Sequence, residues 1–352
     1  MEDRERCGRL RARALVLLSL LLVAQHALAQ GAWPARGTTR LVVFGDFNGP
    51  YGSVTYPAPV PRVVDAIVRD WRPDAVVFTG DVVAGQSKGL TREEIDAMWR
   101  AFDDVIASPL RHAGIPYALS VGNHDASSLR SGSGFSFPVD REAARDYWSD
   151  AAHRTGVHTR AGSDPPFDHS FVLGDVFVAI VDASSAAVTT NQRAWLADEL
   201  SSDAARAATT RIVFGHLPLV PVAVGRDSPG EYVAQGEQLA DLLVERCVSA
   251  YVSGHHAAYY PGVWRGLQML AAGGVGARRL LGSDAEPRST VTVIDVWSEH
   301  GSIRYTTFDA VTLEPVPASR LPEALPTGVV LSQRASAGAP VTCAGIVSNS
   351  AR

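Results

Sequence analysis

Residues 117–125 read Tyr-Ala-Leu-Ser-Val-Gly-Asn-His-Asp, an apolar run that stops at a glycine and continues in Asn123, His124 and Asp125. A short apolar run of this kind predicts a buried strand, here over Tyr117–Val121. The glycine has no Cβ and therefore suits a sharp turn beside a crowded site. Because the string Gly-Asn-His-Asp after a strand has no common structural use, it indicates a functional site at the strand end.

Four more predicted strands end in the same way, with a glycine followed by a side chain that can bind a metal ion. The residues that follow the glycine in the five places are Asp46, Asp81, Asn123, His216 and His255. A single Gly-Asp pair would be read as a turn or a helix cap, since turns favour these residues. In open α/β sheets, however, ligands gather at the carboxyl ends of the strands. Five such strand ends therefore predict one common site.

The first part of the chain alternates between strand and helix patterns. Predicted strands at 41–44, 75–78 and 117–121 are separated by two amphipathic helices. The second helix begins with the capping-box pair Thr91 and Glu94. This order predicts a mostly parallel sheet with helices on its faces.

The second part of the chain contains two predicted hairpins. Residues 171–173 and 176–181 flank a two-residue turn, and residues 290–296 and 303–308 alternate on either side of a short turn. Between the hairpins, we expect Asn191 to cap a helix. The sequence therefore predicts an α/β fold that ends near residue 310.

The side chains at the five strand ends share one kind of chemistry. Carboxylate, amide oxygen and imidazole together suit divalent ions such as zinc, manganese or iron. Two such ions roughly 3.5–4 Å apart can share a carboxylate, activate a bridging water and clamp a phosphoryl group. No thiolate is among the candidates, which argues against a closed structural zinc site.

The ordered blocks resemble those of the calcineurin-like metallophosphoesterases, over about residues 41–308. The blocks are Gly45-Asp46-Phe47-Asn48, Gly80-Asp81, Gly122-Asn123-His124-Asp125, Gly215-His216 and Gly254-His255. The resemblance implies two packed mixed β-sheets flanked by helices, a four-layer α/β/β/α sandwich. It also implies hydrolysis of a phosphomonoester or phosphodiester by a metal-activated hydroxide, with one or two ions of manganese, iron or zinc and a small phosphorylated substrate.

The resemblance also assigns roles to the individual residues. Asp46 would bind the first metal and Asp81 would bridge both ions, whereas the second metal would be bound by Asn123, His216 and His255. His124 would act as general acid or as stabiliser of the phosphoryl oxygens. Asp125 would orient the His124 ring.

Two positions depart from the family pattern. The usual Asp-x-His reads Asp46-x-Asn48, and the usual Gly-His-x-His has Ala257 in its last place. Asn48 is either a weak ligand through its carbonyl oxygen or a plain turn residue. His256 could replace the lost histidine only through a register shift, because neighbours in an extended chain tend to point in opposite directions. We therefore predict one tightly bound ion and one weakly bound ion.

Two other readings stay open at this point. The substitutions at Asn48 and Ala257 would also suit a phosphoesterase-like binding protein that has little or no turnover. A small-molecule-binding α/β protein without metal is the third reading. Since bound ligand stabilises the folded state, metal dependence of thermal stability separates the third reading from the others.

The N-terminus has the pattern of a signal peptide. Arginines precede the apolar run at 14–24, and Ala27-Leu28-Ala29 offers a cleavage site. A membrane anchor is the alternative, but the run is short for a bilayer span. We expect residues 1–29 to be removed and the protein to be secreted or periplasmic without a stable span. A phosphoesterase domain over 38–310 and a loosely structured tail over 311–352 would remain.

Composition limits the possible partners. The chain has 352 residues, a formal net charge of −5, and 20% charged residues. This mildly acidic balance lacks the basic patch of a nucleic-acid-binding protein, so no nucleic acid partner is predicted. Export would permit a disulfide between Cys247 and Cys343; the alternative is a buried Cys247 thiol at a helix end.

Overall fold

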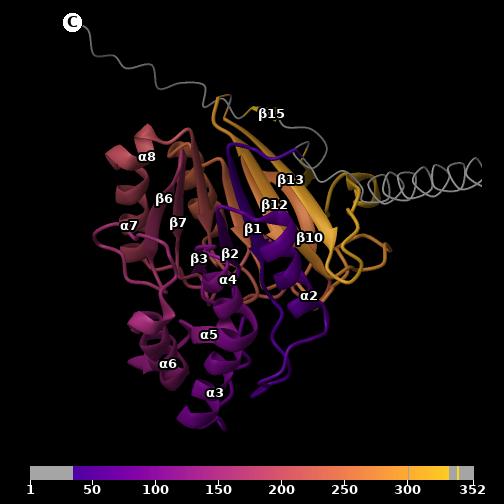
Figure 1. The fold of residues 1–352 in the computed structure, drawn as a ribbon. Coiled ribbons are helices and arrows are strands. Elements are labelled where there is room, and N and C mark those ends of the chain that lie inside the picture. Colours follow the sequence, from indigo (N-terminus) through magenta and orange to yellow (C-terminus); the bar gives the residue numbers. More distant parts are fainter. Residues whose placement is uncertain (1–34, 300, 333–338, 341–352) are drawn as a thin grey trace, which may run out of the picture. The chain divides into compact units, whose positions relative to one another are not determined.

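The computed structural model describes residues 35–299, 301–332 and 339–340. Two large β-sheets occupy its centre (Figure 1). The strands of the first sheet, in spatial order, are β15 (Ala339–Pro340), β13 (Ser302–Asp309), β12 (Thr290–Trp297), β1 (Thr39–Phe44), β2 (Ala75–Phe78) and β3 (Tyr117–Leu119). β1, β2 and β3 are parallel, and β12 runs antiparallel to β1.

The second sheet has seven strands. They are, in spatial order, β14 (Val330–Leu331), β10 (Tyr259–Trp264), β11 (Leu267–Ala272), β9 (Ala250–Ser253), β8 (Thr210–Phe214), β7 (Val176–Ile180) and β6 (His169–Leu173). β7, β8, β9 and β11 are parallel, while β6 and β7 form the predicted antiparallel hairpin.

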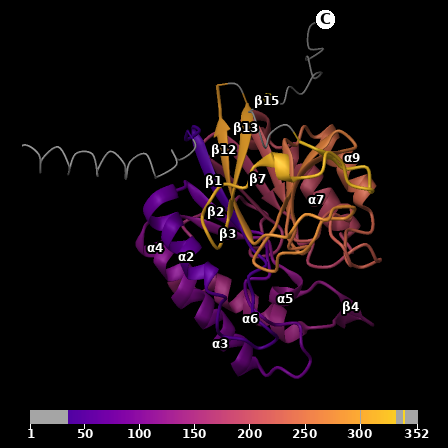
Figure 2. The same cartoon turned by 90° about the vertical axis from the view of Figure 1, so that its right-hand side faces the viewer.

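The helices cover the outer faces of both sheets. Figure 2 shows α2 (Pro59–Ala66) and α4 (Ser108–His112) on one side of the strands, and α7 (Thr190–Leu200) and α9 (Gly236–Glu245) on the other. The remaining α-helices of the described residues are α3 (Arg92–Phe102), α5 (Asn123–Ala126), α6 (Pro138–Ser149) and α8 (Asp203–Ala207). A small hairpin of β4 (Arg130–Ser131) and β5 (Gly134–Phe135) follows α5.

The alternation of side chains along the strands explains the layers. On β1, Leu41 and Val43 pack into the cluster between the two sheets, whereas Val42 and Phe44 pack toward α2 and α3. A strand with both faces buried needs apolar residues at every position, and successive residues point to opposite faces. The predicted four-layer α/β/β/α sandwich is therefore confirmed.

The observed boundaries follow local signals closely. β2 has the predicted bounds, and Thr91 and Glu94 form the predicted capping box of α3. The predicted cap of α7 is wrong: Thr189, not Asn191, accepts the hydrogen bond from the N–H of Gln192. Thr189 and Gln192 form a second capping box, which satisfies two N–H groups that a cap at Asn191 would leave open.

Part of the predicted loose tail packs against the second sheet. β14 pairs with β10, and Val329 and Leu325 are buried. Gly262 of β10 leaves the room that the Val329 side chain occupies, since a Cβ there would lie 2.3 Å from the Val329 Cγ1. In residues 311–332 the structure thus differs from the prediction, because a few isolated apolar residues without periodicity are enough to dock this segment.

Several predictions concern residues outside the described part of the chain. The signal peptide at 1–29, most of the tail beyond residue 332 and Cys343 all lie there. Cys247 is half-buried two residues after α9, and its pairing with Cys343 stays a prediction. Within the described residues, no helix is both long and apolar enough to cross a bilayer.

Candidate metal centre

The carboxyl ends of β1, β2, β8 and β9 meet at one place between the two sheets. The backbone turns that follow them bring Asp46, Asp81, His216 and His255 together. The two sheets are connected there by hydrogen bonds, one of which runs from the His216 Nδ1 to the Thr79 carbonyl oxygen at 2.7 Å. The parallel strand order therefore produces the common site that the sequence predicts.

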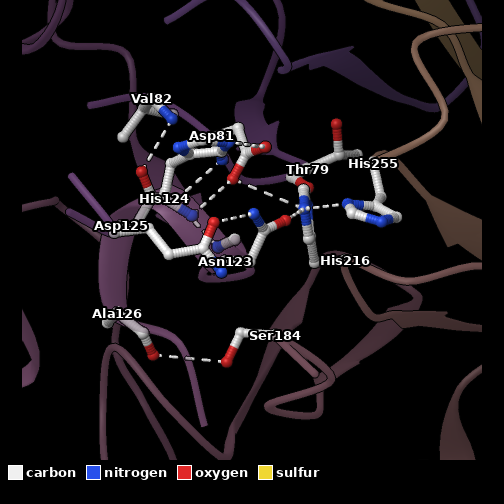
Figure 3. A network of polar contacts seen from close by, with 12 residues as sticks. Thr79, Asp81, Val82, Asn123, His124, Asp125, Ala126, Ser184, His216 and His255 are labelled. Carbon is white, nitrogen blue, oxygen red and sulfur yellow. Dashed lines mark hydrogen bonds and ion pairs between the residues drawn. The ribbon is translucent and has the colours of Figure 1, made fainter. Parts of the chain in front are cut away.

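Three of the four residues predicted for the second metal lie together at one point, and the fourth, Asn123, contacts His216 (Figure 3). Ligand atoms of Asp81, His216 and His255 all lie within 4.8 Å of one another, and all three residues are buried. The His216 Nε2 is 3.4 Å from the Asp81 Oδ1, 2.9 Å from the Asn123 Oδ1 and 3.2 Å from the His255 Nδ1. Two imidazoles, a carboxylate and an amide oxygen thus converge.

Hydrogen bonds on the outer side of each ring determine which nitrogen faces the centre. The His216 Nδ1 donates to the Thr79 carbonyl, and the His255 Nε2 donates to the Glu231 carboxylate at 2.9 Å. The inner nitrogens, the His216 Nε2 and the His255 Nδ1, then lie 3.2 Å apart beside the Asp81 carboxylate. Two imidazole nitrogens directed at one buried carboxylate suit a positive charge, either a proton on His216 or a metal ion, so the residues fit a metal ion.

A proton can take the place of that cation. Burial alone would lower the pKa of His216, but the carboxylates of Asp81 and Asp46 outweigh it and raise that pKa to about 9. For Asp81, burial acts in the upward direction, and the neighbouring histidines hold its pKa well below the usual value. The centre is therefore organised around one positive charge.

Asp46 lies beside this group as a buried carboxylate. Its Oδ2 has no hydrogen-bond partner among the described residues, and burial raises its pKa well above the usual value. A carboxylate oxygen that is buried without a partner is costly unless a cation or a donor reaches it. Asp46 thus suits the first-metal position that the family resemblance implies for it.

The backbone at the centre is strained. Asp46, Asp81, His255 and Ala257 all have positive φ angles, of 50°, 54°, 63° and 45° respectively. Non-glycine residues rarely adopt this conformation, which costs about 1–3 kcal/mol each and clusters at functional sites. The strain indicates that the surrounding structure holds these side chains in place for function.

The two departures from the family pattern fall on the first-metal side. Ala257 is buried and offers only its backbone oxygen, which accepts a hydrogen bond from the Arg278 N–H at 2.8 Å. The Asn48 N–H donates to the Asp81 carbonyl oxygen at 3.1 Å, and its side chain is half-buried. Asp46 and Asp81 are thus the carboxylates that remain for a first ion.

His256 does not take the place of the missing histidine. Its Nδ1 accepts from the Val222 N–H at 3.3 Å, and its Nε2 donates to the Glu231 carbonyl oxygen at 2.9 Å. Burial mainly, and then the neighbouring His255, lowers the pKa of His256 to about 3, so the ring is neutral. Because both ring nitrogens bind backbone groups, recruitment of His256 through a register shift is excluded.

His124 lies at the open side of the centre. Its Nδ1 donates to the Gly85 carbonyl oxygen at 3.1 Å, and its Nε2 is 4.0 Å from the Asp81 Oδ2. The side chain is partly exposed, and the ring centroid of Tyr51 is 5.2 Å away. His124 is thus the titratable side chain that a substrate can reach beside Asp81.

The role predicted for Asp125 is wrong. Its carboxylate accepts four backbone N–H groups, those of Asp81, Val82, Val83 and Gly122, and does not bond the His124 ring (Figure 3). Asp125 is the third residue of α5, and a carboxylate at this position reaches back to the residue that caps the helix. The Gly85 carbonyl orients the His124 ring instead. Burial mainly, and then the charge of Asp81, raises the pKa of Asp125 to about 6.

Three neighbours of the centre are not among the predicted site residues. Glu231 binds His255, the Gln86 Oε1 accepts from the Asn123 Nδ2 at 2.7 Å, and Tyr51 stands beside His124. Glu231 and Gln86 lie in loops without periodicity, so no sequence signal identified them. Tyr51 is near a predicted ligand in the sequence, but its 63% exposure decides that it is a surface residue rather than a packed one.

Comparison with known proteins agrees with this geometry. The family model described as calcineurin-like phosphoesterase matches residues 39–259, which contain all five strand-end blocks. The chain belongs to this family. Calcineurin-like phosphoesterases use divalent metal ions, and the centre of Asp81, His216 and His255 is a candidate site for one.

Relatives of the chain are phosphatases or share its fold. Serine/threonine-protein phosphatase CPPED1 of Bos taurus is 26% identical over 251 residues, which are 68% of this chain and 70% of that protein. The purple acid phosphatase PPD1 of yellow lupin has a TM-score of 0.57 at 17% identity; the match covers 81% of this chain and little more than half, 54%, of the lupin chain. GAP50 of Plasmodium has a TM-score of 0.52 at 14% identity, with 79% and 86% coverage. The two structures support the fold alone.

Proposed function

We propose that the protein hydrolyses phosphoric esters, either phosphomonoesters or phosphodiesters, with a divalent ion held by Asp81, Asn123, His216 and His255. One observation carries the proposal: ligand atoms of Asp81, His216 and His255 gather at one buried point, and the Asn123 amide oxygen lies against His216. Family membership supports the reaction class. The phosphatase CPPED1 supports phosphate esters as the substrates.

An ion in this place would supply Lewis-acid polarisation and a nucleophilic water near neutral pH. The protein's own contribution begins with His124. Because its Nδ1 proton is bonded to the Gly85 carbonyl, the Nε2 of a doubly protonated ring is free to donate to a phosphoryl or leaving-group oxygen. General acid catalysis of this kind contributes about 10²- to 10⁴-fold in rate.

Asp125 prepares the site by holding the backbone. Its four hydrogen bonds fix the segment Asp81–Val83 against the Gly122 turn, and Asp81 in turn accepts from the His124 N–H at 2.9 Å. The ligand carboxylate and the acid are thereby held before substrate arrives. Preorganised polar groups reduce the reorganisation that the reaction requires.

We propose unequal occupancy for the two ions of the site. The four-residue group would bind the tighter ion, while the first-metal side offers Asp46 and Asp81 without a histidine at position 257. Elemental analysis of protein purified without added metal tests this proposal. About one equivalent would support it, and two equivalents that survive dialysis would contradict it.

The test of the reaction is a comparison of metal-free protein before and after addition of Mn²⁺, Zn²⁺ or Fe²⁺. Aryl phosphomonoesters and phosphodiesters serve as general substrates, and His124→Ala serves as the matched variant. We expect metal-dependent turnover that falls by about 10²- to 10⁴-fold in the variant, because only the acid is removed. Equal turnover in both proteins would refute the assignment of His124.

The second candidate function is phosphate binding without turnover. Ala257 supports it, since the lost ligand could abolish hydrolysis and leave anion binding. GAP50, the anchor in the inner membrane complex of Plasmodium, shows that this fold also occurs in a protein described as an anchor. Less than one equivalent of metal together with no hydrolysis of any ester would favour this function.

We also propose export through a cleavable signal peptide at residues 1–29, on the basis of the arginines, the apolar run and the Ala27-Leu28-Ala29 pattern. N-terminal sequencing of the protein recovered from a periplasmic extract or from culture medium tests it. A chain that begins at Gln30 or Gly31 is expected. A chain that retains residues 1–29 would contradict the proposal.

A further inference from the structure

The loop between β8 and α9 places a charged pair directly behind the metal centre. Both ends of the loop are anchored: the Val224 N–H donates to the Arg279 carbonyl oxygen, and the Val233 N–H donates to the Pro218 carbonyl oxygen, each at 2.9 Å. Between these anchors the loop carries Arg226 and Glu231, which form an ion pair with each other. The loop therefore presents a carboxylate from a backbone that is held at both sides.

Glu231 contacts both histidines of the His255-His256 pair. Its Oε2 accepts from the His255 Nε2 at 2.9 Å, and its backbone oxygen accepts from the His256 Nε2 at 2.9 Å. The Arg226 guanidinium binds the same Oε2. Glu231 thus binds the outer nitrogen of His255 through its carboxylate, and its backbone oxygen is held by His256.

We propose that Glu231 is the positioning residue of His255: it fixes the tautomer and the ring orientation that direct the His255 Nδ1 to the metal ion. The proposal rests on the metal site of the proposed function. Glu231 is 30% exposed at its side chain and does not belong to the group of donors around the centre, so its part is to act through His255.

The physical need for such a residue comes from the two forms of neutral imidazole. A proton on Nδ1 would block the nitrogen that faces His216, whereas a proton on Nε2 leaves Nδ1 free for the ion. A carboxylate that accepts from Nε2 selects the second form and also raises the basicity of the ligand nitrogen. Arg226 keeps the carboxylate in place and offsets its charge.

His256 gives the arrangement its rigidity. The ring is fully buried and bridges two backbone groups of the loop, the Val222 N–H and the Glu231 carbonyl. The backbone of Glu231 is therefore fixed to the residue that follows the ligand. A movement of the loop would carry the Glu231 carboxylate away from His255. The hydrogen bond from His256 to the Glu231 backbone opposes that movement, because His256 directly follows His255 in the chain.

The experiment measures metal affinity instead of turnover. Metal-free protein is titrated with Co²⁺, and the visible absorption of bound cobalt gives the dissociation constant for wild type, Glu231→Ala, Glu231→Gln and Asp227→Ala. Asp227 is the matched control, because it is an exposed acid of the same loop. Loss of a group that orients a metal-bound histidine costs about 10- to 100-fold in affinity, which is the loss expected for Glu231→Ala.

The conservative variant separates positioning from a general effect on the fold. Glu231→Gln keeps an oxygen that can accept from the His255 Nε2, so it should retain most of the affinity, and Asp227→Ala should leave the dissociation constant unchanged. If Glu231→Ala does not fold, Glu231→Asp replaces it; its chain is one methylene shorter, and the same loss is expected.

The outcomes distinguish the two proposals. Wild-type protein that binds no Co²⁺ would overturn the metal site of the proposed function itself. Wild-type protein that binds Co²⁺, together with a Glu231→Ala or Glu231→Asp variant whose affinity equals that of Asp227→Ala, would overturn the positioning role alone.

Discussion

Substitution of Gly122 by alanine should displace the bridging carboxylate. A Cβ at position 122 would lie 2.2 Å from the Asp81 Oδ1 and 2.3 Å from the Asp81 backbone nitrogen. The backbone angles of Gly122, φ −90° and ψ 174°, suit any residue. The effect of Gly122→Ala would therefore come from the contact with Asp81 and not from backbone strain.

The size of the displacement follows from the contact distance. Ordinary contacts of a Cβ begin at 3.4 Å, so the Asp81 Oδ1 or the Gly122 turn must move by more than 1 Å. A misplacement of about 1 Å at a reacting group can cost 10²-fold in rate. We expect kcat/KM to fall by about that factor and metal affinity to weaken as well, because Asp81 serves both. Overpacking should also lower the free energy of unfolding by about 1–3 kcal/mol.

The assay combines three measurements on Gly122→Ala and on Gly89→Ala. These are the metal dissociation constant, kcat/KM on an aryl phosphate, and urea denaturation. A Cβ at Gly89 would have no atom within 4 Å, so the control should match wild type in all three. Gly122→Ala with the metal affinity and kcat/KM of the control would refute the placement of Asp81 at the centre of the reaction.

Three more perturbations test other parts of the molecule. Asp125→Asn puts an amide NH₂ among four backbone N–H donors. We expect the free energy of unfolding, measured by urea denaturation, to fall by about 1–3 kcal/mol. An unchanged denaturation midpoint would contradict the hydrogen bonds assigned to Asp125. Burial lowers the pKa of His169 to about 4. The unfolded chain then gains the proton first as pH falls below 6.5, and wild type should lose about 2 kcal/mol of stability at pH 5 through this residue alone. His169→Gln should flatten this part of the profile between pH 7 and 5, whereas an equal slope in both proteins would argue against it. Tyr51→Ala should raise KM for aryl phosphates severalfold and leave KM for alkyl phosphates unchanged, because the exposed ring beside His124 can stack on an aromatic leaving group. Tyr51→Phe, which keeps the ring, is the control. Parallel changes of KM in both substrate classes would exclude stacking.

The sequence predicts those features of the fold that are encoded locally. The apolar run at 75–78 is a strand with the same bounds, and the Gly174-Asp175 turn joins two paired strands. The four residues of the second-metal group come together because parallel strands deliver their carboxyl ends to one place. The true cap of α7 was also accessible, since Thr189 and Gln192 have capping-box spacing.

Other features depend on geometry that no periodicity encodes. The Asp125 carboxylate turns back on its own helix start, a direction decided by its third position in a four-residue helix. Glu231 reaches His255 only because a loop of irregular conformation is anchored at both ends. Likewise, His256 is excluded as a ligand by two backbone partners that become visible only in three dimensions.

The two-residue strand β14 has a practical consequence for shortened versions of the chain. Removal of everything after residue 310 would expose Gly262 and Val263 along the border of the second sheet, together with the hollow that Val329 fills. Uncovered strand borders recruit other chains through their unpaired amide groups. Truncation at residue 310 should therefore give an aggregating product, and recombinant expression should retain the chain to at least residue 332.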